Sequence, residues 1–248
     1  MYWEDEGILI ELRNHGEKNS IIKVLTEKHG FCAGLVKGGQ TKKFRSTLNP
    51  GAQLDLRWSA RLPEHLGVFN VDVIKGRSTL FMGRKLQLFG FNSLCSMIIM
   101  FLAEREPVKR LYLDTKDLIE AIETGSNWLK SYVIWEKNLL KEIGFGLELS
   151  ICAVTGSRQN LSHVSPKSGK AVCRKIAEPW KEKLLKLPNF LISAENVTDA
   201  KVIELVEGLA LTGHFFTDWA LPEFNKVRLP DARIKLICEA VFNTIKKE

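Results

Sequence analysis

The first part of the chain carries short apolar runs separated by turn residues. Five such runs, with alternating or β-branched apolar positions, span residues 7–13, 20–26, 31–37, 52–58 and 67–74. Turn signals such as Gly38-Gly39 and Asn49-Pro50-Gly51 lie between them. Short runs bounded by glycine, proline and asparagine are typical of β-strands. Five strands within roughly 75 residues predict a small barrel, and the five-stranded OB-fold is the leading candidate.

The pattern changes to helical spacing after Arg77. Apolar residues recur at helical intervals from Leu80 to Leu102, and Glu106-Pro107 ends the run. Further helices are predicted, while residues 152–172 look rich in loops. The further helices are predicted at residues 114–123, 127–143, 177–185, 199–219 and 230–247. The predicted fold class is therefore α+β, with an OB-fold domain at residues 1–78 followed by an α-helical domain at residues 79–248.

The longest apolar stretch is too short and too polar for a membrane span. It covers residues 86–102. Gln87, Asn92 and Ser93 interrupt it, whereas a span needs about 20 apolar residues. The chain begins Met-Tyr-Trp-Glu-Asp-Glu, which is acidic where a signal peptide is basic. Five scattered cysteines without a close pair fit a reducing compartment. These features predict a cytoplasmic protein with no membrane partner.

Positive charge is concentrated in two windows. The chain has 36 basic and 29 acidic side chains, a net charge of +7. Residues 37–61 hold six basic residues against one acidic residue, and residues 166–186 hold seven against two, so each window is net +5. The rest of the chain is net acidic. Such clustering is typical of a protein that binds a polyanion. On charge alone, a solvated surface with chance clustering is an equal alternative.

The first basic window is the more informative for binding. Residues 38–45 form a predicted flexible connection, in which glycines let the backbone approach a phosphate chain and lysines neutralise it. OB-folds also use aromatic side chains on which bases stack. Phe31 and Trp58 are expected to fill the barrel core, Phe69 is a further candidate platform, and Phe44 is expected to be exposed. The candidate DNA-binding residues of both windows are Lys37, Lys42, Lys43, Phe44, Arg45, Arg57, Lys167, Lys170, Arg174 and Lys175.

Catalytic motifs are missing from the sequence. Residues 165–171 superficially resemble a phosphate-binding loop, but Val164 stands where the first glycine belongs and Ala171 replaces the hydroxyl residue. Neither Gly-x-Ser-x-Gly nor His-Glu-x-x-His occurs. His214 and Asp218 lie four residues apart on a predicted helix, which is more typical of a surface hydrogen bond than of a catalytic pair. We therefore expect no enzymatic activity.

Two cysteines bear on a metal site. Two Cys-x-x-Cys pairs would close a tetrahedral zinc site. Here Cys152 is followed at that spacing by Thr155, and Cys173 by Ile176. Two thiols cannot close a structural site unless His163 and another group join them. The preferred interpretation is a packed loop without metal, and no cofactor is expected.

Short phrases occur in a characteristic order along nearly the whole chain. In the first part they are Trp3-x-Asp5-Glu6-Gly7-Ile8, His15-Gly16-Glu17, Val36-Lys37-Gly38-Gly39, Asn49-Pro50-Gly51, Arg61-Leu62-x-Glu64-His65-Leu66-Gly67 and Glu104-Arg105-Glu106-Pro107. In the second part they are Glu142-Ile143-Gly144-Phe145-Gly146-Leu147, Cys152-Ala153-Val154-Thr155-Gly156, Val164-Ser165-Pro166-Lys167-Ser168-Gly169-Lys170-Ala171-Val172 and Leu211-Thr212-Gly213-His214-Phe215. Together they resemble the RecO family of bacterial DNA repair proteins, particularly its alphaproteobacterial members.

The resemblance implies an OB-fold, a helical domain and a function in DNA repair and recombination. Family members bind single- and double-stranded DNA and anneal complementary strands without ATP. They contact the acidic, hydrophobic C-terminal tail of single-stranded DNA-binding protein. With RecR, in the RecF pathway, they help RecA replace that protein. The implied location is the bacterial cytoplasm, at the nucleoid.

The resemblance also bears on the metal. Some members of the family carry a zinc site of four cysteines in the helical half. This chain keeps only Cys152 and Cys173 of those positions, so the loop around residues 152–176 is a degenerate, zinc-finger-like segment.

Two groups of residues are assigned to these partners as hypotheses. One DNA strand is held by Lys37, Lys42, Lys43 and Arg45. The track is extended by Lys167, Lys170, Arg174 and Lys175. An apolar pocket rimmed by cations would receive the acidic tail, and its candidate cations are Arg84, Lys85, Lys109 and Arg110. Two alternatives stay open. One is a general OB-fold nucleic-acid binder, including one that acts on RNA, and the other is a protein-interaction adaptor with little affinity for nucleic acid.

Overall fold

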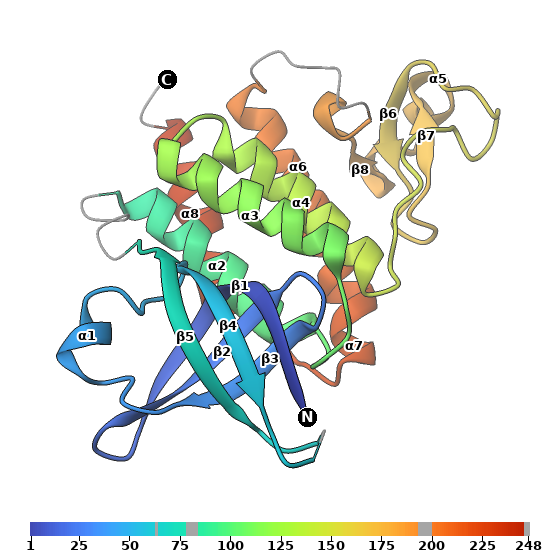
Figure 1. Cartoon of the computed structure of the whole chain (residues 1–248). Coiled ribbons are helices and arrows are strands. Elements are labelled where there is room, and N and C mark those ends of the chain that lie inside the picture. The colour runs from blue at the N-terminus through green and yellow to red at the C-terminus, as the bar shows by residue number, and fades with distance from the viewer. Residues whose placement is uncertain (63, 78–83, 193–199, 246–248) are drawn as a thin grey trace. The chain divides into compact units, whose positions relative to one another are not determined.

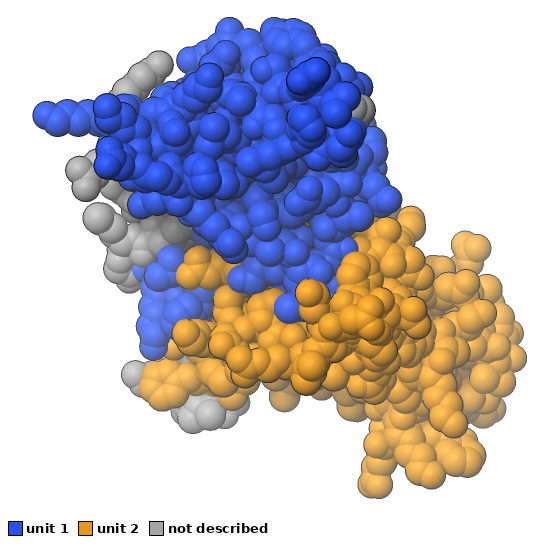
Figure 2. Space-filling model, turned by 90° about the horizontal axis from the view of Figure 1, so that it is seen from below, with its two compact units in different colours: residues 1–91, 95–123 blue, residues 92–94, 124–248 orange. Residues whose placement is uncertain are grey.

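The computed structural model describes residues 1–62, 64–77, 84–192 and 200–245, with the backbone alone at 43, 45 and 243–245 (Figure 1). The chain divides into two compact units, which Figure 2 colours separately. Unit 1 comprises residues 1–91 and 95–123, and unit 2 comprises residues 92–94 and 124–248. No helix within the described ranges is long and apolar enough to cross a membrane.

Unit 1 begins with a closed barrel of five strands. The strands are β1 (Tyr2–His15), β2 (Asn19–Thr26), β3 (Gly30–Val36), β4 (Gln53–Ser59) and β5 (Val68–Lys75). Strand β1 pairs antiparallel with both β2 and β4, and a short parallel pairing of β3 with β5 closes the order β1-β2-β3-β5-β4 (Figure 1). The five-stranded sheet predicted from the sequence is confirmed, and its order is consistent with an OB-fold.

The barrel closes because each strand buries one face. In β4, Leu54, Leu56 and Trp58 are buried while Asp55 between them is exposed, which is the period-two pattern of a half-buried strand. Phe31, Trp58 and Phe69 are all buried. Trp58 belongs to the barrel core cluster, as expected, and Phe69, a candidate platform, belongs to the same core. Phe31 is buried outside that cluster, because alternate residues of β3 point to opposite faces and Cys32 is the one that faces the core.

Gly30 opens β3 with a positive φ of 69°, and a Cβ atom there would lie 1.8 Å from the Glu106 carbonyl oxygen. We expect Gly30→Ala to lower the free energy of unfolding by about 2 kcal/mol more than Gly16→Ala. Gly16 is the matched control because it has a similar φ of 62° and open space around its Cα atom. Urea unfolding of both variants measures the difference. Equal losses of unfolding free energy would show that residues 104–107 move away from a Cβ atom at position 30 without destabilising the fold.

Unit 1 extends beyond the barrel into two helices. These are α2 (Lys85–Phe101), whose residues 92–94 belong to unit 2, and α3 (Lys109–Thr124), whose last residue belongs to unit 2. Helix α3 starts five residues before its predicted position, since Leu111 and Tyr112 already belong to its buried stripe. Its end is tied to the barrel by Glu123, which accepts from Lys75 at 2.7 Å and from Arg77 at 3.3 Å. The domain boundary near residue 78 stays a prediction.

Unit 2 is mainly helical. It contains α4 (Trp128–Glu142), α6 (Val202–Phe215), a π-helical turn η3 (Phe216–Ala220), α7 (Leu221–Glu223) and α8 (Asp231–Ile245). The helices predicted at 127–143, 199–219 and 230–247 correspond to α4, to α6 with η3, and to α8. Between α4, α6 and α8 lies a buried ion pair of Glu136 with Arg233.

A small sheet begins in the segment, residues 152–172, that the sequence presents as rich in loops. Strands β6 (Leu161–Val164), β7 (Ala171–Cys173) and β8 (Leu185–Lys186) pair antiparallel in the order β7-β6-β8. The helix predicted at 177–185 was wrong, because α5 (Arg174–Ala177) passes into the 3-10 turn η1 (Glu178–Lys183) and then β8. A second such turn, η2 (Asn189–Leu191), follows. Strands this short show no readable alternation.

Candidate nucleic-acid interface

The first group of predicted DNA-binding residues lies between β3 and β4 of the barrel. Lys37 directly follows β3, and Lys42 begins the single-turn helix α1 (Lys42–Arg45). Both side chains are exposed, and within the described part of the chain neither forms an ion pair. Their charges are therefore available to a polyanion. The side chains of Lys43 and Arg45 lie outside the described residues.

The connection that carries these lysines is held in place, contrary to the predicted flexibility. The Gly38 backbone N–H donates to Asn19 Oδ1 at 3.0 Å, and Gln40 Nε2 donates to the Asn19 carbonyl at 2.6 Å. The Thr41 hydroxyl donates to the Gly38 carbonyl at 2.7 Å. The bonds to Asn19 hold the connection against the start of β2, so the backbone that carries the lysines is ordered.

Two other predicted residues of this window are less available than expected. Phe44, expected to be exposed, is half-buried and packs against the barrel core, because one turn of α1 directs it inward. Arg57 lies on β4 and pairs with Asp72 of β5, so much of its charge is neutralised locally. Within the described residues, Lys37 and Lys42 are thus the exposed cations of this group without an ion pair, and their contact with DNA stays a prediction.

The second group lies in unit 2, around β6 and β7. Lys167 is exposed in the turn between the two strands, while Lys170 pairs with Glu148 at 3.2 Å. Arg174 and Lys175 are exposed at the start of α5 and line a polar recess of about 470 Å³. The recess also contains Ser157, Gln159, Asn160 and Cys173. The two groups of cations therefore belong to different units.

The degenerate cysteine site does not supply a set of zinc ligands. The Cys173 backbone N–H donates to Cys152 Sγ at 3.3 Å, and the Thr155 hydroxyl oxygen lies 3.9 Å from Cys173 Sγ. In the described ranges no group of three or more His, Cys, Asp or Glu side chains is close enough to hold a metal ion. A hydroxyl therefore stands where a third thiolate would be needed.

The polar surroundings of Cys152 have a consequence for its ionisation. Burial raises the pKa of this thiol, but hydrogen bonds from the Thr155 hydroxyl and from nearby backbone N–H groups outweigh it and lower the pKa to about 6. The thiolate of Cys152 absorbs at 240 nm, and Cys152→Ser lacks this absorbance. As pH rises, we expect the difference in absorbance between the wild type and this variant to appear with a midpoint near pH 6. Cys32→Ser is the control, because burial raises the pKa of Cys32 to about 11. A Cys152 midpoint above pH 8 would contradict the assignment.

The residues proposed to rim a tail-binding pocket lie in two separate places. Arg84 donates to the Glu123 carbonyl at 2.8 Å, so Arg84 and Lys85 lie near the end of α3. Lys109 and Arg110 lie at its beginning. At 1.5 Å per residue, the two ends of α3 are about 20 Å apart. The four cations therefore do not converge on one pocket.

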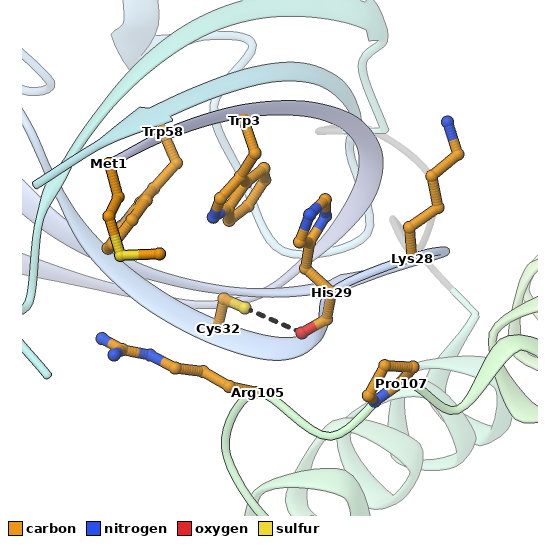
Figure 3. A pocket seen from close by; sticks show the side chains of 8 residues that line it. All are labelled: Met1, Trp3, Lys28, His29, Cys32, Trp58, Arg105 and Pro107. Carbon is orange, nitrogen blue, oxygen red and sulfur yellow. Dashed lines mark hydrogen bonds between the residues drawn. The ribbon is translucent and has the colours of Figure 1, made fainter. Parts of the chain in front are cut away.

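Unit 1 contains an apolar pocket of about 230 Å³ that the sequence did not indicate (Figure 3). We call it the aromatic pocket, and its lining residues are Met1, Trp3, Lys28, His29, Cys32, Trp58, Arg105 and Pro107. The Trp3 ring stacks on His29 at 4.1 Å between centroids and on Trp58 at 5.6 Å. Trp3 and Trp58 meet because they are partners in the β1–β4 register. Residue pattern alone does not contain that register.

The architecture defines a chain in which an OB-type barrel is followed by helices, with exposed cations in both compact units. Two family models match: Recombination protein O N terminal over residues 1–77, and Recombination protein O C terminal over residues 86–236. The chain is 45% identical to the DNA repair protein RecO of Cereibacter sphaeroides over 96% of this chain and 97% of that protein. The RecO proteins of Roseobacter denitrificans and Dinoroseobacter shibae are 41% and 40% identical, over 96% and 95% of this chain and 97% and 96% of their own lengths. The chain belongs to the RecO family, and its role lies in DNA repair and recombination.

Proposed function

We propose that the chain is a recombination mediator that binds single- and double-stranded DNA and anneals complementary strands without ATP. The observation that carries the proposal is the exposure of Lys37 and Lys42, without ion pairs in the described ranges, at the two ends of the ordered connection from β3 to α1. Lys167, Arg174 and Lys175 add exposed cations in unit 2. The protein acts as a binder and not as an enzyme.

Annealing needs no catalytic group on this proposal. Two strands repel each other through their phosphates, and a protein that offers positive charge to both lowers the repulsion and raises their local concentration. Unit 1 contains one group of cations and unit 2 the other, and on this proposal each group contacts a strand. Binding releases counterions from the phosphates, so the affinity for DNA falls as the salt concentration rises.

The partners of the reaction follow from the family resemblance. With RecR, the chain helps RecA replace single-stranded DNA-binding protein at gaps, in the cytoplasm at the nucleoid. The acidic tail of that protein is attracted to cations, and Lys109 and Arg110 are exposed at the start of α3. Each already has an acidic neighbour, Glu27 and Asp114, which the tail would displace.

The test is annealing of two complementary strands coated with single-stranded DNA-binding protein, without ATP, at low and high salt. The expected result is acceleration that weakens at high salt and that fails when the coating protein lacks its acidic tail. Absence of acceleration by a folded protein would contradict the proposal. Stronger salt-dependent binding to RNA than to DNA would favour a general nucleic-acid binder, and partner binding that survives loss of the lysines would favour an adaptor.

A further inference from the structure

We propose that the aromatic pocket of unit 1 holds one unstacked base of a single DNA strand. The inference deepens the proposed function and rests on it, because it assigns a base-binding position to a protein that otherwise grips phosphates. None of the residues that the charge pattern marks for DNA binding lines this pocket.

The row of rings is held rigidly before any ligand arrives. His29 is fixed by Asp5, a 7% exposed carboxylate whose Oδ2 lies 3.2 Å from His29 Nδ1 and accepts from the Lys28 backbone N–H at 2.7 Å. Trp58 Nε1 donates to the Leu66 carbonyl at 3.1 Å. Trp3 is held between the two rings. Preorganised aromatic side chains bind planar groups at little cost in conformational entropy.

The facing wall contains a residue in an unfavourable backbone conformation. Arg105 has a φ of 66°, which side chains with a Cβ atom rarely adopt. Its backbone N–H donates to the Phe31 carbonyl at 2.8 Å, and its Nη2 donates to the His65 carbonyl at 2.6 Å. The guanidinium lies 5.5 Å from the centre of the Trp58 ring. Strained backbone conformations are common at binding sites. Here the conformation of Arg105 places its guanidinium beside the row of rings.

Size and lining select a single planar group. The volume of about 230 Å³ is below the roughly 300 to 1,000 Å³ of typical small-molecule pockets. The pocket therefore accepts one ring system and excludes a whole dinucleotide or cofactor. Rings, Met1 and Pro107 provide an apolar interior, with Cys32 at its floor (Figure 3). Nucleobases bind such surfaces by stacking and by edge-to-face contact, largely without regard to sequence.

The arrangement of charge favours a base within a strand over an aromatic side chain of a peptide. Lys28 and the guanidinium of Arg105 lie at opposite ends of the row of rings (Figure 3). A nucleotide inside a strand has a phosphate on each side of its base and can contact both cations. A peptide that ends in an aromatic residue brings its terminal carboxylate to one side only.

The test compares two strands of about a dozen nucleotides, within the span that one OB-fold covers. One is an oligothymidylate, and the other has the same sugar–phosphate length with abasic sites. Cys32→Met fills the floor of the aromatic pocket. Cys95→Met is the matched control, because Cys95 is also buried in unit 1 and does not line the pocket. Thermal melting establishes that both variants are folded, and Trp3→Leu, which removes the central ring, is the second variant.

The wild type is expected to bind the thymidylate on the order of tenfold more tightly than the abasic strand, the gain from burying one base in the aromatic pocket. Cys32→Met and Trp3→Leu should lose this preference and keep the abasic affinity, while Cys95→Met keeps both. Equal affinity of the wild type for the two strands, or a preference that survives in Cys32→Met, would overturn the inference and leave the proposed function standing. Failure to bind either strand would overturn the proposed function itself.

A peptide ligand has its own outcome. The probe is an acidic peptide that ends in phenylalanine with a free carboxylate. If it binds the wild type, fails to bind Cys32→Met, and the wild type shows no preference for bases, the pocket belongs to a peptide and the inference is wrong.

Discussion

Replacing Arg233 by methionine is expected to lower the free energy of unfolding by about 3 to 5 kcal/mol. Arg233 of α8 is 3% exposed and Glu136 of α4 is 0% exposed. Their side chains meet at 2.7 Å and 2.9 Å, and Arg233 also donates to the Leu209 carbonyl at 2.8 Å. Removing the guanidinium leaves a carboxylate in the core of unit 2 without its counter-charge. Urea unfolding followed by tryptophan fluorescence measures the loss.

The control for this prediction is an ion pair at the surface of the same helix region. Arg228 contacts Asp231 at 3.4 Å with both side chains well exposed, so Arg228→Met is expected to cost less than about 1 kcal/mol. The double variant Glu136→Leu with Arg233→Met should recover most of the loss, because an apolar pair needs no counter-charge. An equal loss in Arg228→Met, or no recovery in the double variant, would contradict the explanation.

The fold could be predicted where its signal is local. The β4 strand alternates buried Leu54, Leu56 and Trp58 with more exposed neighbours, and such alternation is visible in the residues themselves. The helices of unit 2 could be predicted in the same way, because their apolar residues recur at helical spacing. By contrast, β6 and β7 are four and three residues long, too short for a period to emerge, and they were mistaken for loops.

The same distinction applies to the side chains discussed above: some are indicated by neighbouring residues, and others meet only through the fold. Lys37 and Lys42 could be proposed from the sequence because charge clustering is a property of neighbouring residues, and the structure shows that both side chains are exposed. Trp3 and Trp58 come together only through the pairing of β1 with β4, and Glu136 meets Arg233 across 97 positions of sequence. The predicted exposure of the Phe44 side chain was wrong for a related reason. Its charged neighbours indicated exposure, but one helical turn directs a side chain according to backbone geometry.

The DNA contact of the barrel yields a prediction on affinity. The double variant Lys37→Glu with Lys42→Glu is expected to bind single-stranded DNA about 100-fold more weakly near 0.1 M salt, since each neutralised phosphate of a single strand contributes about 0.7 logarithmic units per tenfold change in salt. The reversed charges add repulsion to the loss of counterion release. The magnitude of the slope of log affinity against log salt should also decrease by about 1.4. Fluorescence anisotropy over a series of salt concentrations measures both quantities.

The matched control changes the same net charge elsewhere in unit 1. Lys109→Glu with Arg110→Glu places two carboxylates at the start of α3, where the helix dipole tolerates them. This variant should keep the DNA affinity and the salt slope, because both of its cations lie at the start of α3, outside the two groups of predicted DNA-binding residues. If both variants lose affinity equally, the net charge of the protein attracts DNA, and the ordered connection after β3 is not a contact. If only the Lys37 and Lys42 variant loses affinity and slope together, the phosphates are held at that connection.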